Sequence, residues 1–143
     1  MTIQHTIELP SLARGVHLIT RHIAPHVAQI ETGIAHLFLQ HTSASLALNE
    51  NYDPDVRNDI ETFLRSLVPD GWSAFAHTLE GPDDMPAHMK NILIGADLSI
   101  PITRAQLNLG TWQGVYLLEH RQHPQRRTLI LTLMGEPTPR SHT

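Results

Sequence analysis

Residues 97–134 read DLSIPITRAQLNLGTWQGVYLLEHRQHPQRRTLILTLM and establish the kind of fold. Four β-prone segments lie in this stretch, near 97–102, 106–109, 112–121 and 127–134. Each is short, rich in Leu, Ile, Val or Thr, and bounded by Gly, Pro or charged residues, as strands commonly are. The stretch therefore predicts a fold in which short strands dominate.

Towards the N-terminus, the chain adds further strands and one helix. Short β-prone or well-buried runs predict strands at residues 2–9, 16–20 and 33–41. Apolar residues recur at helical spacing over 21–31, which predicts a helix there. Pro25 favours a start near Ala24, because proline is tolerated only in the first turn of a helix.

The middle of the chain carries the clearest helix signals. For a helix over 53–68, Asp53 supplies an N-cap and Pro54 stands at the first helical position. Its apolar positions form a single stripe: Val56, Ile60, Phe63, Leu64 and Leu67. A second helix is expected from about Asp84 to Ile94, ending at Gly95. Many short strands with two or three helices predict an α+β fold, namely a two-sheet β-sandwich with the helices at one side.

Composition excludes several classes of protein. A chain of 143 residues predicts one domain spanning residues 1–143. No cysteine is present, which excludes disulfides, thiolate metal sites and cysteine nucleophiles. The net charge of −4 argues against nucleic-acid binding. No signal peptide or membrane-spanning apolar run is recognisable, so we expect a cytoplasmic protein without a membrane partner.

Polar residues interrupt the apolar pattern first in the segment 41–53, HTSASLALNENYD. Hydroxyls, amides and a helix N-terminus in one segment can surround an anion, with His41 and Glu50 as acid–base groups. An alternative of equal weight is a strand end, a hydroxyl-rich turn and a helix cap, in which Thr42, Ser45 and Asp53 have structural roles.

A second cluster, HTLEGPDDMPAH at 77–88, contains two histidines and three carboxylates. These are the ligand types of a divalent-metal site, although the spacing matches no standard metal motif. The carboxylates could also hold magnesium against a pyrophosphate. Alternatively, Asp83 or Asp84 caps the second helix and both histidines, His77 and His88, are exposed.

Two further clusters lie in the C-terminal half. Gly110 and Gly114 bracket Trp112, which indicates either a ligand close to the backbone or a β-bulge with Trp112 in the core. Glu119, His120 and Arg121 end an apolar strand. Strand ends hold side chains rigidly and are suitable for a site, but a histidine such as His120 on an apolar face is more often a hydrogen-bonded core residue.

Three blocks in chain order resemble the YjbQ family, which carries the label "secondary thiamine-phosphate synthase enzyme". They are HTSASLALNENYDPDVRNDIE (41–61), EGPDDMPAH (80–88) and LGTWQGVYLLEHR (109–121). The similarity runs from about Gly15 to Glu136. One departure is Ala105-Gln106, where the family pattern tends to have Gly-Arg. If that arginine binds an anionic substrate, Gln106 cannot replace its charge, although Arg104 could.

The resemblance implies a β-sandwich with jelly-roll-like features, assembled as a homotrimer with sites near subunit interfaces. It also implies a low thiamine-phosphate synthase activity on phosphorylated small molecules. Residues carried over or inferred as catalytic are His41, Glu50, His88, Glu119, His120 and Arg121. Those expected to bind substrate are Thr42, Ser43, Asn49, Asp83, Asp84, Trp112 and Gln113. A divalent metal, zinc or magnesium, would bind His77, His88 and either His120 or His41.

Three functions follow for this site, and no organic cofactor is expected. The first is a metal-dependent enzyme in which Arg121 or Lys90 neutralises a leaving pyrophosphate. The second is a hydrolase in which zinc on His77, His88 and His120 activates water. The third is a non-enzymatic trimer that binds a metal or a small ligand.

Overall fold

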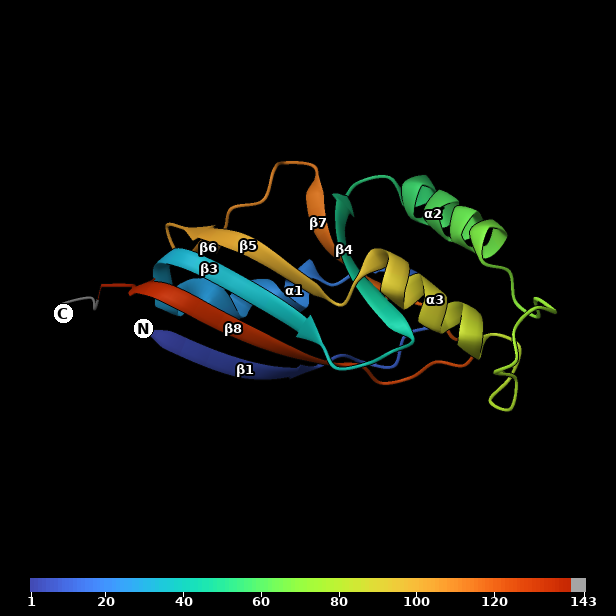
Figure 1. Ribbon diagram of the computed structural model, residues 1–143. Helices are drawn as coiled ribbons and strands as arrows, with labels where there is room; N and C mark the ends of the chain where they lie inside the picture. Colours follow the sequence, from blue (N-terminus) through green and yellow to red (C-terminus); the bar gives the residue numbers. More distant parts are fainter. Residues whose placement is uncertain (140–143) are drawn as a thin grey trace.

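The computed structural model describes residues 1–139 and consists of two antiparallel sheets with helices at one end (Figure 1). In chain order its elements are β1 (Thr2–Glu8), β2 (Gly15–Leu18), α1 (Thr20–Ile23), the 3-10 helix η1 (Ala24–Gln29), β3 (Ile30–Leu39), β4 (Ala44–Glu50), α2 (Pro54–Leu67), α3 (Asp84–Ile94), β5 (Asp97–Thr103), β6 (Gln106–Leu107), β7 (Gln113–Glu119) and β8 (Thr128–Pro137). The α+β class and the two sheets are as predicted. None of these helices is long and apolar enough to cross a membrane.

The five-stranded sheet has the order β1-β8-β3-β5-β6, and the three-stranded sheet has the order β2-β7-β4. One core cluster contains buried side chains of both sheets, including Leu37 and Leu131 of the larger and Leu46 and Leu117 of the smaller. The two sheets therefore pack face to face. A smaller cluster, Leu64, Tyr116 and Leu118, lies between α2 and the other face of the three-stranded sheet.

Both long helices are found where the sequence places them. The Asp53 side chain caps α2 by accepting the Asp55 N–H at 2.9 Å, and α3 ends at Gly95 with a φ of 110°. The predicted stripe of α2 is only partly buried, because Leu64 faces the sheet whereas Phe63 and Leu67 are exposed.

Two sequence predictions need correction. The helix expected over 21–31 is the short α1 followed by η1, because Pro25 has no N–H to donate and interrupts regular helix. Strand β4 was not predicted, since ASLALNE has few β-branched residues. It forms because it pairs with β7 along its whole length, from Ala44 opposite Glu119 to Glu50 opposite Gln113.

Candidate metal centre and the charged pocket beside it

His77, Asp84 and His88 form a compact cluster whose ligand atoms all lie within 4.8 Å of one another. One carboxylate oxygen, Asp84 Oδ2, is 2.7 Å from His77 Nε2 and 3.0 Å from His88 Nε2. Two imidazoles with one carboxylate are a donor set used for zinc and for non-haem iron, leaving other coordination positions open. The residues therefore fit a divalent metal.

Helix α3 provides two of the three ligands. Asp84 and His88 are four residues apart, which places their side chains on one helix face. His88 Nδ1 lies 2.7 Å from the Thr42 carbonyl oxygen. A carbonyl oxygen only accepts, so Nδ1 carries a hydrogen, and Nε2, which faces Asp84 Oδ2, is the nitrogen whose lone pair a metal ion would take. Ligating histidines in metal sites are commonly oriented by such a bond.

His77 comes from the loop that joins α2 to α3. Its Nε2 is also 2.7 Å from Glu80 Oε2. The pKa of His77 is raised, chiefly by the hydrogen bond to Asp84, with burial opposing and the charges of Glu80 and Asp84 reinforcing the shift. Without a metal, a proton on His77 therefore neutralises the carboxylates, and a metal would take its place.

Arg121 fixes the start of α3. Its Nε donates to Asp83 Oδ2 at 2.8 Å, and Nη1 is 2.7 Å from Asp84 Oδ1. Burial would raise the pKa of Asp84, but the bond from His77 and the charges of His88 and Arg121 lower it below its usual value. Asp84 is thus an ionised carboxylate with one oxygen held by the arginine and the other facing both histidines. Neither Asp83 nor Asp84 caps the helix through its side chain.

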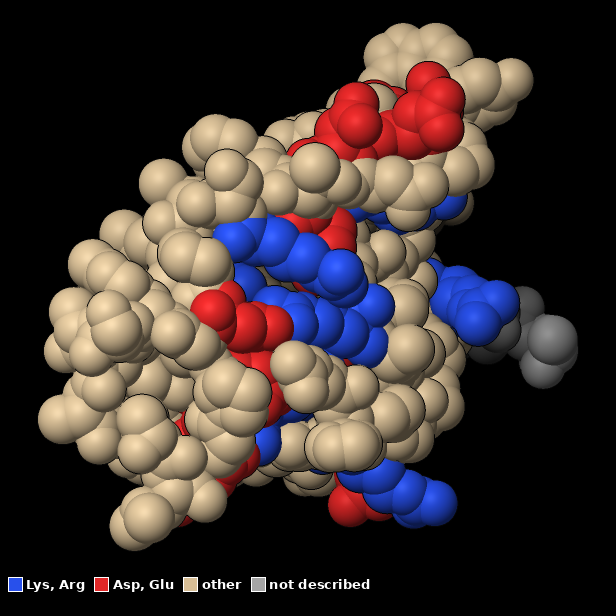
Figure 2. Space-filling model, turned by 90° about the vertical axis from the view of Figure 1, so that its right-hand side faces the viewer, with Lys and Arg blue, Asp and Glu red and all other residues tan. Residues whose placement is uncertain are grey.

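A pocket of about 430 Å³ opens beside the cluster. We call it the charged pocket; its lining is Gln40, His41, Thr42, Ser43, Glu80, Asp84, His88, Arg121, Gln125 and Arg127. Figure 2 views the molecule from the end where the α2–α3 loop lies, and Lys and Arg side chains gather in the middle of this face beside Asp and Glu. The pocket combines two residues of the cluster, Asp84 and His88, with two guanidinium groups.

Arg127 and Glu119 form a buried ion pair at the base of this region. Two guanidinium nitrogens lie 2.6 Å from the two carboxylate oxygens, and Nη2 also donates to Ser43 Oγ at 2.9 Å. Glu119 is fully buried, so it cannot reach a substrate. Its carboxylate positions Arg127, whose guanidinium borders the pocket.

His41 is held with one nitrogen towards the backbone. Its Nε2 accepts the Thr128 N–H at 2.8 Å. Burial and the charge of Arg127 lower the pKa of His41, with Glu119 opposing. The ring is therefore neutral at pH 7, and its hydrogen is on Nδ1, where it can donate to an anion in the pocket.

His120, expected as a catalytic residue and a third imidazole ligand, does not join the cluster. It is 1% exposed, and its Nε2 lies 2.9 Å from Ser45 Oγ. The third member of the cluster is Asp84 instead. Lys90, considered as a counter-charge for pyrophosphate, is also 1% exposed and does not line the charged pocket. Burial is the main cause of its lowered pKa.

Four expected site residues lie at the opposite end of the three-stranded sheet. They are Asn49, Glu50, Trp112 and Gln113. Strand β4 begins at Ala44, at the end of the sheet near the metal cluster, and ends at Glu50. At the usual rise per strand residue, Ala44 and Glu50 are roughly 20 Å apart. One chain therefore cannot bring these four side chains to the metal cluster.

At that far end, each of the four has a local role. The Glu50 carboxylate accepts the backbone N–H groups of Tyr52 and Asp53, and the Gln113 side chain accepts the Gly110 N–H at 2.8 Å. The Asn49 side chain accepts the Glu50 N–H. Trp112 is 63% exposed and packs edge-on against Tyr52, with ring centroids 5.7 Å apart. Trp112 is therefore not the core residue that the β-bulge alternative expects.

Ala105 and Gln106, where the chain departs from the family pattern, lie away from the charged pocket. They form the turn and start of the β5–β6 hairpin.

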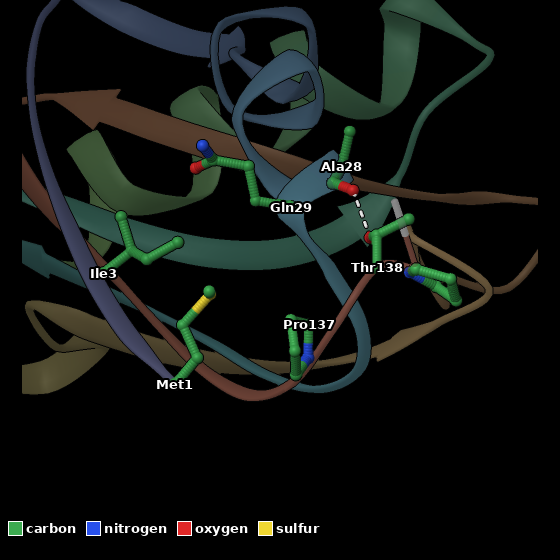
Figure 3. A pocket seen from close by; sticks show the side chains of 7 residues that line it. Met1, Ile3, Ala28, Gln29, Pro137 and Thr138 are labelled. Carbon is green, nitrogen blue, oxygen red and sulfur yellow. Dashed lines mark hydrogen bonds between the residues drawn. The ribbon is translucent and has the colours of Figure 1, made fainter. Parts of the chain in front are cut away.

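A separate hollow of about 640 Å³ also lies away from the charged pocket. It is lined by Met1, Ile3, Ala28, Gln29, Pro137, Thr138 and Pro139 (Figure 3). It contains no ionisable side chain and none of the expected site residues.

The sequence analysis missed Arg14 and Asp70, which support the loop that carries His77. The Arg14 guanidinium binds the Asp70 carboxylate through two bonds of 2.6 and 2.9 Å, and Gln122 also donates to Asp70. The partners are 56 residues apart in the chain, so no local pattern indicates the pair.

Comparison with known proteins places the chain in a family. The model of the family described as UPF0047 protein YjbQ-like matches residues 5–136. The chain belongs to the YjbQ family. The YjbQ protein of Salmonella typhimurium is 49% identical over 139 residues, covering 95% of this chain and all of that protein. The Escherichia coli O157:H7 protein is 46% identical over the same length.

Solved structures agree with this family assignment. A conserved hypothetical protein from Thermus thermophilus matches with a TM-score of 0.83 and 32% identity, covering 91% of this chain and 99% of that chain. A YjbQ/UPF0047 family protein from Clostridium acetobutylicum matches with a TM-score of 0.79 and 31% identity, covering 92% and 99%. The family that the motifs resemble is thus the one to which the chain belongs.

Proposed function

We propose that this protein is a divalent-metal-dependent enzyme that acts on a small phosphorylated molecule. The observation that carries the proposal is the orientation of His88, whose Nδ1 is bound to Thr42 so that Nε2 faces Asp84 and His77. A bound divalent ion such as zinc supplies a Lewis acid and lowers the pKa of a coordinated water to about 7. All three ligands would come from this chain.

A bound metal would change the charge of the pocket. Glu80 and Asp84 line it with Arg121 and Arg127, whose partners Asp83 and Glu119 bring these six charged groups to a net charge of −2 when the histidines are neutral. A divalent ion would neutralise this charge, so that an anion would meet no net repulsion. The phosphate group has the charge and oxygen geometry that guanidinium groups and metal ions prefer.

The residues of the chain would share the work on such a substrate. Arg127, held by Glu119 and Ser43, and the neutral His41 would bind phosphate oxygens. Arg121 would keep Asp84 ionised and oriented. Glu80 is the exposed carboxylate nearest His77 and would accept a proton there. Asp83 is a positioning residue for Arg121.

Thiamine-phosphate synthesis is one reaction of this class, and the family resemblance supports it. A carbon–nitrogen bond forms between the thiazole phosphate and the pyrimidine methylene carbon, while the bond from that carbon to the pyrophosphate oxygen breaks. The pyrophosphate leaves with the bonding electron pair. In this reaction the charged pocket would bind the leaving group.

Hydrolysis is a second candidate function, and the composition of the cluster favours it. Two histidines and one carboxylate with open coordination positions are also the ligands of zinc hydrolases. Activity that is lost on chelation and restored by zinc rather than magnesium would identify this reaction. If no phosphorylated compound reacts, the third function remains, in which the protein is a trimer that binds metal without turnover.

We also propose that the protein works in the cytoplasm as a homotrimer with sites near the subunit interfaces. Exposed apolar side chains support self-association: Ile34, Phe38 and Met134 on the five-stranded sheet, and Phe63 and Leu67 on α2. An assembly could bring the far-end residues of one subunit, such as Trp112, to the metal cluster of another. The mass of the protein in solution tests this proposal.

Metal analysis of protein purified without an affinity tag tests the proposed function. We expect about one divalent ion per chain in the wild type and in His36→Ala, a matched control that removes an exposed histidine 3.1 Å from Asp97. His88→Ala and His77→Ala should lose the ion while remaining folded by circular dichroism. Equal metal content in all four proteins, or none after equilibration with zinc, contradicts the proposal.

A further inference from the structure

A second pocket, of about 310 Å³, lies beside the metal cluster, and its lining is aromatic and apolar. We call it the aromatic pocket. Trp72 and Phe75 lie in it edge to face, with ring centroids 4.8 Å apart at 69°. Met85 and Pro86, from the first turn of α3, line it as well. Its volume is about twice the ~150 Å³ that accommodates benzene and lies at the small end of ligand pockets.

His77 joins the aromatic pocket to the charged one. Its imidazole lines the aromatic pocket, while its Nε2 lies 2.7 Å from both Glu80 and Asp84, which line the charged pocket. The two pockets therefore adjoin at His77, a residue of the proposed metal cluster.

The linings of the two pockets are chemically opposite. The charged pocket has two carboxylates and two guanidinium groups, whereas His77 is the only ionisable side chain of the aromatic pocket. Trp72 is 53% exposed, so a large aromatic surface remains to be covered. A flat ring placed there would contact Trp72 and Phe75 and remove apolar surface from water.

Resting on the proposed function, we infer that the aromatic pocket binds a ring of the substrate while the phosphate of the same molecule lies in the charged pocket. The substrate class is a mono- or bicyclic aryl or heteroaryl compound that carries a phosphate a few bonds from the ring. Trp72 and Phe75 are then specificity residues, since they touch the ring and leave the metal ligands unaltered.

Calorimetric titration of the zinc-loaded protein with two phosphonates tests this inference. Phenylphosphonate and methylphosphonate share the anion and differ in the ring. We expect phenylphosphonate to bind at least tenfold more tightly, and Trp72→Ala to abolish this preference while keeping the zinc content and the affinity for methylphosphonate. Phe75→Leu should reduce the preference less, because leucine keeps apolar volume. Tyr52→Ala, which removes an exposed aromatic side chain outside both pockets, is the matched control and should keep the preference.

The result separates failure of the pocket from failure of the proposed function. Equal affinities for the two phosphonates, or an unchanged preference in Trp72→Ala, overturn the inference even if zinc binds. If no zinc binds, the pocket is tested alone in Trp112→Phe, whose single tryptophan is Trp72. Saturable quenching of its fluorescence by p-nitrobenzyl alcohol then supports a ring site without the metal, and a linear, unsaturable response rejects it.

Discussion

At the scale of single residues, His120 shows how burial changes an ionisable group. Its Nε2 is bonded to Ser45, and its Nδ1 has no hydrogen-bond partner among the described residues. Burial, and then the positive charges of Lys90, Arg14 and Arg127, lower the pKa of His120 to about 3. The folded protein therefore holds this imidazole neutral throughout the pH range in which it would protonate in the unfolded chain.

This difference makes stability depend on pH. A lowered pKa in the folded state means that the unfolded state binds more protons between the two values, so the contribution to stability is complete above about pH 6.5 and is lost as the pH falls towards 3. Between pH 7.5 and pH 5, His120 should account for a loss of about 2 kcal/mol. We expect His120→Gln to lack this component, so that its deficit against the wild type in urea unfolding shrinks by about that amount at pH 5. Parallel pH profiles of the two proteins would show that His120 does not carry the effect.

At the scale of secondary structure, local signals predicted α2 and α3 but not the strand between the polar motifs. The cap at Asp53 and the glycine after α3 act within one helix turn, so the sequence displays them. Strand β4 exists because β7, more than sixty residues later in the chain, pairs with it. Once β4 is a strand, residues that are neighbours in the motif, such as His41 and Glu50, lie at opposite ends of a sheet. A helix has the converse effect and brings positions 84 and 88 together on one face, although the sequence analysis placed Asp84 with the substrate-binding residues.

The β5–β6 hairpin contains two residues in the left-handed region. Arg104 and Ala105 have φ values of 52° and 62°. Two such residues are typical of a type I′ turn, for which asparagine and glycine are preferred. Removing the steric conflict of a Cβ atom at this φ is worth about 1–2 kcal/mol, partly offset by about 0.4–1 kcal/mol of extra freedom in the unfolded chain.

We therefore expect Ala105→Gly to raise the free energy of unfolding by about 0.5–1 kcal/mol. Ala47→Gly, at an ordinary strand position in β4, provides the control and should lower it by about 0.5–1 kcal/mol. Urea unfolding at pH 7.5 measures both. A destabilised Ala105→Gly would mean that the turn does not carry this strain.

At the scale of the whole molecule, the functional residues divide between the two ends of the three-stranded sheet. Residues of α3 and of the α2–α3 loop, which lie together at one end of the molecule (Figure 1), contribute to the charged pocket, the metal cluster and the aromatic pocket. Sequence alone named His77 and His88, two of the three residues that the structure brings together in the cluster. It could not choose Asp84 over His120, because that choice depends on which side chain the packed sheets bury.

The metal cluster also joins a loop to a helix. His77 belongs to the loop between α2 and α3, whereas Asp84 and His88 belong to the helix. An ion bound to all three would fasten the loop to α3. Trp72 and Leu79 of this loop are exposed, and both are residues after which chymotrypsin cleaves.

Susceptibility to protease should therefore report the bound ion. We expect chymotrypsin to cut the chelator-treated wild type within residues 72–79 several-fold faster than the zinc-loaded protein, and to cut His88→Ala rapidly with or without zinc. Gel electrophoresis with mass analysis of the two fragments measures the rates. Equal cleavage with and without zinc would mean that the loop is held by Arg14 and Asp70 alone. If zinc does slow the cleavage, then the loss of metal in a cell would expose this protein to degradation at the same loop that forms its site.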